Sequence, residues 1–316
     1  SIFSLNNDIV QNQMGALEAQ RSEPMVYLRK IPDLAAGHAG ITYPHTSGKS
    51  VFAGRYVKPD YVLEKYLVQG SGDYVLPVIF LKPEPDPADE IVLMIHSEGV
   101  EYAVNHDSVA HELVKEGYAV LLTDLPGIGS MGPGYFKGDS YIDGVSYNQW
   151  FAAMLTGRSF VGLHAEDIIR VVQFVKDHMQ VLAGVSVLAT GPLGSDLLHA
   201  ALFEPDIKRV CLVNSFLSYA DIASIRFYKP DFVPFLVPGA IEDYDLPDLM
   251  ASLCPREILI IDPVSGDGSI ASEAKAQKIL TFPSDVYIDK NVPQHFKVIN
   301  SRDQQSILRY LLSWLQ

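Results

Sequence analysis

The sequence predicts an α/β protein with a doubly wound, mostly parallel sheet, and two observations support this prediction. Short runs of consecutive apolar residues recur from residue 91 onward, and segments of helical periodicity separate them. A strand buried on both faces is apolar throughout, and helices return the chain between parallel strands. Glycine-rich turns also follow several of the apolar runs, at the sheet edge where such folds bind ligands.

The first 58 residues differ from the rest, and residues 1–58 are predicted to be an N-terminal arm or a linker. Residues 8–18 have the pattern of a short amphipathic helix. Residues 37–54 are rich in Gly, His, Ser and Thr and are expected to form a loop. The main domain is therefore expected to span residues 59–316.

The main domain is predicted to open with a hairpin and then to alternate strands with helices. Residues 61–68 and 74–81 are strand-like, and the Gly-Ser-Gly-Asp sequence between them has turn chemistry. Further strands are expected at 91–95, 118–123, 185–189, 209–213, 257–261 and 295–299. Helices are expected at 108–116, 167–178, 196–203 and 304–314. The apolar, β-branched strand 185–189 is predicted to lie inside the sheet.

The composition disfavours some classes of partner. A formal net charge of −14 argues against binding a nucleic acid or an anionic membrane surface. No apolar run reaches the roughly 18 residues of a membrane span. Cys211 and Cys254 lie in or beside apolar segments and are expected to be buried free thiols. The chain starts at Ser1 without a leader pattern, so either a leader was removed or this is a segment of a longer polypeptide.

Two strand ends carry the residues most relevant to chemistry. The strand 91–95 ends in His-Ser-Glu-Gly at 96–99. The strand 185–189 runs through a glycine-rich turn, Thr-Gly-Pro-Leu-Gly-Ser at 190–195, directly into a helix. Strand, tight turn and helix in this order form the setting of a nucleophile elbow.

Several further stretches, in order, resemble the α/β-hydrolase fold, and most closely its acetyl xylan esterase and dienelactone-hydrolase-like branch. They are residues 157–162 (GRSFVG), 204–210 (EPDIKRV), 237–239 (VPG), 244–249 (YDLPDL) and 251–256 (ASLCPR). The likeness covers roughly residues 60–316. It implies an ester hydrolase acting on acylated carbohydrates, with a serine nucleophile, a histidine base, an acid and no cofactor. It also implies a periplasmic or secreted location, which the sequence itself does not identify.

The nucleophile position departs from the pattern that this resemblance implies. The elbow pattern is G-x-S-x-G, and aligning Gly191 with its first place puts Leu193 at the apex and Ser195 in the last place. Leucine offers no oxygen or sulfur to attack a carbonyl. Its side chain is expected to point into the old active-site pocket. Ser195 stands where the next helix starts, so a helix N-cap is preferred for it over a nucleophile.

The base position also departs from the pattern. His295 precedes residues 296–299, which are expected to be the last strand, so His295 falls at the amino-terminal end of that strand. The loop that follows, residues 300–303, contains Arg302, which is not a base at neutral pH. An alternative register makes residues 286–288 the last strand and would place His295 in the correct loop.

The acid and oxyanion positions are better populated. Asp262 or Asp267, after the strand 257–261, is either a leftover triad acid or a turn residue. In the oxyanion loop at 96–99, where backbone N–H groups would do the work, His96 is expected to be structural. The residues expected in a vestigial pocket are His96, Ser97, Leu193, Gly194 and Asp262. No histidine pair has a zinc spacing, and we expect no metal and no cofactor.

These departures favour a catalytically inactive, esterase-like domain, a pseudo-hydrolase. Such a domain would bind a carbohydrate or small ester, or support a catalytic domain in the same polypeptide. A first alternative is an active carbohydrate esterase that uses Ser195, Asp267 and His295. A second alternative is a structural interaction module.

Overall fold

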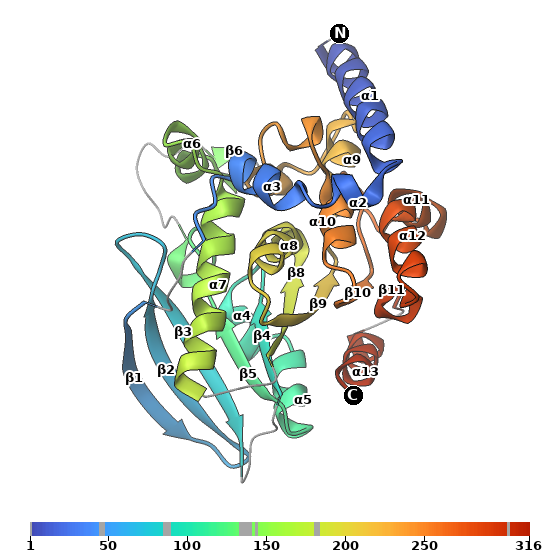
Figure 1. Cartoon of the computed structure of the whole chain (residues 1–316). Helices are drawn as coiled ribbons and strands as arrows, with labels where there is room; N and C mark the ends of the chain where they lie inside the picture. The colour runs from blue at the N-terminus through green and yellow to red at the C-terminus, as the bar shows by residue number, and fades with distance from the viewer. Residues whose placement is uncertain are drawn as a thin grey trace.

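A nine-stranded sheet runs through the centre of the computed structural model, with helices on both faces (Figure 1). The structure describes residues 2–43, 48–84, 90–132, 141–142, 145–179, 184–301 and 304–316. The strands of the main sheet are β1 (Ser50–Val57), β2 (Tyr61–Gln69), β3 (Val75–Pro83), β4 (Ile91–Ile95), β5 (Ala119–Thr123), β8 (Val185–Thr190), β9 (Ile207–Val213), β10 (Glu257–Ile261) and β11 (Phe296–Ile299). A separate two-stranded sheet joins β6 (Tyr141–Ile142) and β7 (Val145–Ser146).

The helices cover the sheet and form the N-terminal part of the chain. They are α1 (Ile2–Arg21), α2 (Pro24–Tyr27), α3 (Ile31–Ala39), α4 (Val100–Asn105), α5 (Val109–Lys115), α6 (Asn148–Leu155), α7 (Phe160–Met179), α8 (Gly194–Phe203), α9 (Tyr219–Ala223), α10 (Leu246–Ser252), α11 (Glu273–Ile279), α12 (Thr281–Asp289) and α13 (Gln304–Leu315). In the described part of the chain, none of them combines the length and the apolar character that crossing a bilayer requires.

The strand order confirms the doubly wound, mostly parallel sheet. The order is β1-β2-β3-β5-β4-β8-β9-β10-β11. The strands from β5 to β11 in that order pair in parallel, whereas β1, β2, β3 and β5 pair antiparallel. The predicted hairpin is the β2–β3 pair. The predicted interior strand is β8, which lies between β4 and β9.

Each strand contributes to two hydrophobic layers because successive side chains point to opposite faces. In β4, Leu93 and Ile95 join the layer under α7 and α8, and Val92 and Met94 join the layer under α5 and α13. This two-sided burial explains why the strands read as unbroken apolar runs. Both cysteines are free, Cys211 fully buried and Cys254 half-buried.

The N-terminal region contains more regular structure than the sequence predicted. The helix expected at 8–18 extends over the whole of α1. Residues 50–54, expected to belong to a loop, form part of β1 and pair with β2 at the edge of the sheet. Apolar and polar residues do not alternate along β1, and nearly all of its residues are exposed. The sequence therefore showed no two-residue periodicity that would predict a strand there.

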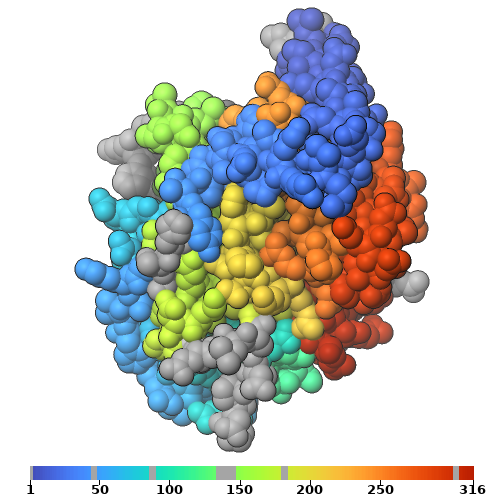
Figure 2. Space-filling model, in the orientation of Figure 1, coloured from blue at the N-terminus to red at the C-terminus, as the bar shows by residue number. Residues whose placement is uncertain are grey.

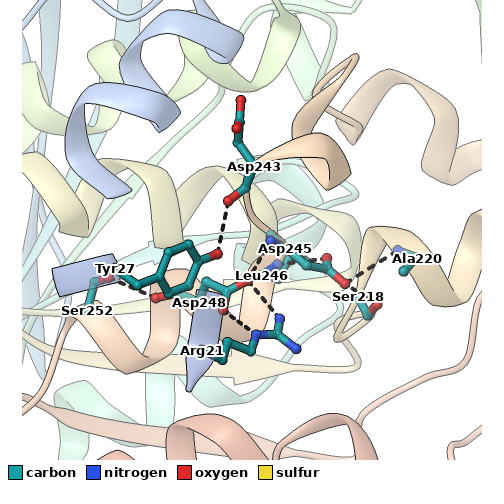
Figure 3. A network of polar contacts seen from close by, with 9 residues as sticks. All are labelled: Arg21, Tyr27, Ser218, Ala220, Asp243, Asp245, Leu246, Asp248 and Ser252. Carbon is teal, nitrogen blue, oxygen red and sulfur yellow. Dashed lines mark hydrogen bonds and ion pairs between the residues drawn. The ribbon is translucent and has the colours of Figure 1, made fainter. Parts of the chain in front are cut away.

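A buried ion pair anchors the N-terminal helices to the body. In Figure 2 these helices, in blue, lie over the elements coloured yellow and orange. Arg21, at the end of α1, donates two hydrogen bonds of 2.7 Å to the fully buried carboxylate of Asp248 in α10. Asp248 also accepts the backbone N–H of Asp245, which caps the same helix. The hydroxyl of Tyr27 donates to the carbonyl oxygen of Asp243 at 2.9 Å (Figure 3).

Candidate active site

A cavity of about 920 Å³ opens at the carboxyl edge of the sheet. Its wall includes residues from the loops that follow four parallel strands: His96 and Ser97 after β4, Gly191 after β8, Asn214 after β9 and Val264 in the loop after β10. Parallel strands bring their carboxyl ends to one edge, which is where open α/β sheets bind ligands. The strand ends that the sequence analysis singled out therefore line a cavity.

The turn after β8 has its apex at Gly191. Gly191 has a φ of +60°, and a 3-10 turn over Gly191–Leu193 leads straight into α8. Proline lacks an N–H and favours the first positions of a helix, so Pro192 fits the first turn of this segment, directly after the left-handed Gly191. A Cβ on Gly191 would lie 3.1 Å from Ser97 Oγ, so the apex faces the oxyanion loop.

The prediction that Leu193 occupies the apex is wrong by two residues. Leu193 has right-handed helical backbone angles, and its side chain is completely buried in the core. Gly194 is buried as the first residue of α8, where a Cβ would lie 2.4 Å from Ser215 Oγ. The described cavity wall includes His96 and Ser97 of the five expected pocket residues, and leaves out Leu193, Gly194 and Asp262.

Ser195 is a buried residue inside the first turn of α8. Its Oγ lies 2.6 Å from the hydroxyl oxygen of Tyr219, and only 1% of the residue is exposed. The predicted N-cap role is wrong because α8 begins one residue earlier and has Leu193 at its N-cap. Burial raises the pKa of Tyr219 well above its usual value, so this phenol stays protonated as the partner of Ser195.

The three residues of the active-esterase alternative do not come together. Asp267 is exposed and accepts hydrogen bonds from the backbone and the hydroxyl of Ser269, which lower the pKa of its carboxyl. His295 Nδ1 donates to the carbonyl oxygen of Pro255 at 2.7 Å, at the amino-terminal end of β11. Ser195 lies at the opposite, carboxyl-terminal edge. The alternative register for His295 is wrong, because residues 286–288 belong to α12.

Asp262, one of the two residues expected at the acid position, directly follows β10 and has a left-handed conformation with a φ of +50°. Its Oδ1 accepts the backbone N–H of Ser301 at 2.6 Å, and its Oδ2 accepts the Ser301 hydroxyl. Ser301 lies in the loop after β11, where the resemblance implies a histidine base. The next two residues, Arg302 and Asp303, lie outside the described residues.

His96 has a fixed position beside the cavity. Its Nδ1 accepts the backbone N–H of Glu98 at 3.1 Å, so the ring proton is on Nε2, which faces Asp107 Oδ2 at 3.6 Å. Burial lowers the pKa of His96, against the opposing effect of the carboxylates of Asp107 and Glu98. The Tyr102 ring stacks on His96 with 5.1 Å between ring centroids, and on His106 at the same distance.

Two backbone positions next to the apex offer no free N–H group. The N–H of Ser97, in the oxyanion loop, donates to Thr190 Oγ1 at 2.9 Å. In the fold's usual arrangement the second donor is the N–H of the residue after the nucleophile. That residue here is Pro192, which has no N–H. Among the described residues, no group of three or more His, Cys, Asp or Glu side chains could hold a metal ion.

No protein-family model matches this sequence, and no curated protein matches it either. Solved structures do match. A structure from Bacteroides fragilis, provisionally assigned as an acetyl xylan esterase, has a TM-score of 0.69 and 17% identity over 89% of this chain and 76% of its own. An acetyl xylan esterase from Paenibacillus has a TM-score of 0.58 and 14% identity, covering 90% of this chain and 93% of its own. A glucuronoyl esterase from Solibacter usitatus has a TM-score of 0.59 and 11% identity, covering 90% and 92%. This chain therefore has the α/β-hydrolase fold.

Proposed function

We propose that this chain is a pseudo-hydrolase, an esterase-like domain that keeps a ligand pocket and does not transfer acyl groups. The observation that carries the proposal is the Gly191-Pro192 turn at the end of β8. Gly191, at the apex, has no side chain to attack a carbonyl. Pro192 has no N–H to donate to an oxyanion, and removal of one such donor costs roughly 10²–10³ in rate.

The pairing of Asp262 with Ser301 supports the same proposal. In acyl-transfer triads the acid orients a histidine, which takes the proton from the nucleophile. The carboxylate of Asp262 is instead bonded to the backbone and hydroxyl of Ser301. A serine hydroxyl is not a base at neutral pH, so this pair holds two strand ends together without accepting a substrate proton.

The cavity supports a ligand-binding role with a neutral, hydroxyl-rich ligand. Its wall offers the hydroxyl of Ser97 and the exposed amide of Asn214 as hydrogen-bonding groups. The carboxylates of Glu98 and Asp107 also line it, whereas Lys229 on the rim is paired with Asp231 at 3.2 Å. This charge balance disfavours an anionic ligand. An acetylated xylan fragment is the ligand class that the names of the structural neighbours suggest. Binding of such a fragment would support a catalytic domain in the same polypeptide.

Two measurements test the proposal. Turnover of 4-nitrophenyl acetate should stay at the buffer rate and should be unchanged by Ser195→Ala. Calorimetry with acetylated xylo-oligosaccharides should show binding that weakens in Asn214→Gly, which removes the amide and keeps the left-handed backbone accessible. Turnover that disappears in Ser195→Ala would favour an active esterase. Absence of binding together with absence of turnover would favour a structural module.

A further inference from the structure

We propose that the buried pair of His164 and Asp196 is a proton-dependent latch for the cavity. It holds the loop after β5 in place while it keeps its proton, and it releases the loop as the pH rises. His164 is in α7 and Asp196 is in the first turn of α8, and the two helices lie side by side (Figure 1). His164 Nδ1 lies 3.1 Å from Asp196 Oδ2, and its Nε2 lies 2.8 Å from the carbonyl oxygen of Pro126 in that loop. Both side chains of the pair are completely buried.

The loop that the pair holds forms part of the cavity wall. Gly127 and Ile128, the next two residues of the loop, both line the cavity. The ends of the loop are fixed separately, because the carboxylate of Asp124 accepts the backbone N–H groups of Val100 and Ser130. The hydrogen bond from the histidine therefore acts on the middle of the loop, where the wall is.

The His164 ring also contacts the wall through two phenylalanines. The Phe160 ring meets it edge-on with 4.9 Å between ring centroids, and a Cβ on Gly127 would lie 3.0 Å from Phe160 Cε1. The Phe235 ring, which lines the cavity, lies 6.0 Å from the His164 ring. A change at His164 therefore reaches the cavity through packing as well as through the hydrogen bond.

The geometry of the pair determines how many protons it must hold. A carbonyl oxygen only accepts, so His164 Nε2 carries a hydrogen. The contact between Nδ1 and Asp196 Oδ2 needs one further proton, on either atom. If the pair loses that proton, one hydrogen is left for two contacts, and in one of them two lone pairs face each other. The loss therefore replaces a hydrogen bond, to Asp196 or to Pro126, with a repulsive contact in the core.

The surroundings of the pair make this loss costly while the loop is in place. In the described part of the chain, Asp196 Oδ1 has no hydrogen-bond partner, so an unshared negative charge there would be buried without compensation. Two further ionisable groups face the pair, Asp167 from α7 and Tyr219 from α9, and burial keeps Tyr219 neutral by raising its pKa well above the usual value. Burial by itself would lower the pKa of His164. The carboxylate of Asp196, the carbonyl of Pro126 and the carboxylate of Asp167 outweigh it, and the pKa of His164 is raised.

Opening the loop removes these costs, because water then solvates both side chains of the pair. A solvated histidine has a pKa of about 6.5. A group whose pKa is raised in the closed state stabilises that state fully below its ordinary pKa, and the stabilisation is lost as the pH rises through the raised pKa. Above about pH 6.5 the ratio of closed to open loop therefore falls by up to about tenfold per pH unit. The latch acts on the wall itself, so it does not depend on which ligand the cavity takes.

Nuclear magnetic resonance of the full chain between about pH 6 and about pH 9 tests the latch. The amide nitrogen shift of Gly127 responds to hydrogen bonding at the preceding Pro126 carbonyl, so it should titrate in the wild-type chain. The hydrogen-exchange protection of the Gly127 and Ile128 amides, corrected for the intrinsic pH dependence of exchange, should fall by at least about fivefold. Amides of β9 measure the change in global stability over the same range.

Two carboxyl-to-amide variants separate a latch from a purely structural contact. Asp196→Asn removes the titrating carboxyl, and the asparagine NH2 group can donate to His164 Nδ1, so its loop should stay protected throughout and should not titrate. Asp289→Asn is the matched control: it makes the same change at an exposed carboxyl outside the pair and should behave as the wild type. If Asp196→Asn does not fold, His164→Gln replaces it, because glutamine does not titrate and its loop should also lose the pH dependence.

Three outcomes would overturn the proposal. In the first, the protection of the loop amides in the wild type is constant with pH, or falls only as much as that of the β9 amides. In the second, Asp196→Asn or His164→Gln keeps the wild-type pH dependence. In the third, the loop of Asp196→Asn is unprotected at every pH, which would mean that the pair only holds the core together.

Discussion

Asp262 accepts hydrogen bonds from both the backbone N–H and the hydroxyl of Ser301, and so joins the ends of β10 and β11. The two residues are 39 positions apart in the chain. In a hydrolase of this fold the carboxylate would hold an imidazole instead. Under the proposed pseudo-hydrolase function, the acid position keeps its carboxylate and Ser301 stands where the base would be.

The pairing predicts a coupled loss of stability. Asp262→Asn should lower the free energy of unfolding by about 1.5–3 kcal/mol, because hydrogen bonds to a charged acceptor are lost while the asparagine still tolerates the left-handed backbone. Ser301→Ala should cost about 1 kcal/mol. Urea unfolding of both single variants and the double variant checks this. Full additivity in that cycle would mean that the two side chains do not interact.

Gly191→Ser is expected to restore no esterase activity. The serine would lack a base and an oxyanion donor at Pro192, and triad members act as a unit. A left-handed non-glycine residue also costs roughly 1–2 kcal/mol, and its Cβ would lie 3.1 Å from Ser97 Oγ. The checks are the burst phase and the steady-state rate with 4-nitrophenyl acetate. The triple variant Gly191→Ser, Pro192→Ala, Ser301→His supplies all three missing groups and should exceed the single variant. Efficient turnover by the single variant would mean that a base and an oxyanion donor are present and that only the nucleophile is missing.

Leu193→Ser should be inactive for a different reason. Leu193 is completely buried in the core, so the new hydroxyl would be buried without a partner and a cavity would form around it. We expect a loss of about 3–5 kcal/mol in the free energy of unfolding and no burst with the acetate ester. Thermal melting and the same assay measure both. A stable Leu193→Ser variant that is acylated by the acetate ester would mean that residue 193, and not residue 191, stands at the apex.

The buried pair His164–Asp196 predicts a stability that falls as pH rises. His164 Nδ1 lies 3.1 Å from Asp196 Oδ2, and Nε2 lies 2.8 Å from the carbonyl oxygen of Pro126. Burial raises the pKa of Asp196 to about 6. Burial by itself would lower the pKa of His164, but the neighbouring carboxylate of Asp196 outweighs it, and the pKa of His164 is raised. Both groups therefore bind protons more tightly in the folded state. Their contribution to the free energy of unfolding is fully present below about pH 4. It is lost as the pH rises through about 6 and beyond the ordinary histidine range.

Asp196→Asn removes one of the two titrating groups and isolates this effect. The free energy of unfolding of the wild-type chain, minus that of Asp196→Asn, should decrease between about pH 4 and about pH 7. Urea titrations at several pH values measure it. A difference that is constant with pH would show that the pair does not titrate in this range.

Arg21→Ala should release α1 and destabilise the domain. It leaves the buried carboxylate of Asp248 without its bidentate partner, and breaking a buried ion pair in this way costs about 3–5 kcal/mol. Arg21→Lys keeps the charge but loses the two-pronged geometry, so an intermediate loss is expected. Hydrogen exchange of α1 should accelerate in the order wild type, Arg21→Lys, Arg21→Ala. Unchanged exchange in Arg21→Ala would mean that apolar packing alone holds the helix.

The central strands of the sheet could be predicted from the sequence, because the information that specifies a buried parallel strand is local. Each of β4, β5, β8, β9 and β10 is an apolar run, and such a run has few alternatives to burial on both faces. The sequence also shows that none of Gly191, Pro192 and Leu193 is a serine, although it left Ser195 open as an alternative nucleophile. By contrast, β1 carries exposed side chains on both faces, so its place at the sheet edge depends on its backbone pairing with β2.

The residue at the apex and the partners of the buried polar groups could not be predicted from the sequence and became known from the folded structure. The shift from Leu193 to Gly191 follows from where the helical segment begins, which depends on the packing of α8 against α7 and β9 as well as on Pro192. The partners of Ser195 and Asp262 are Tyr219 and Ser301, which are 24 and 39 residues away. A side-chain hydrogen bond extends only a few ångströms, and spacing along the chain does not predict which distant groups folding brings within that range.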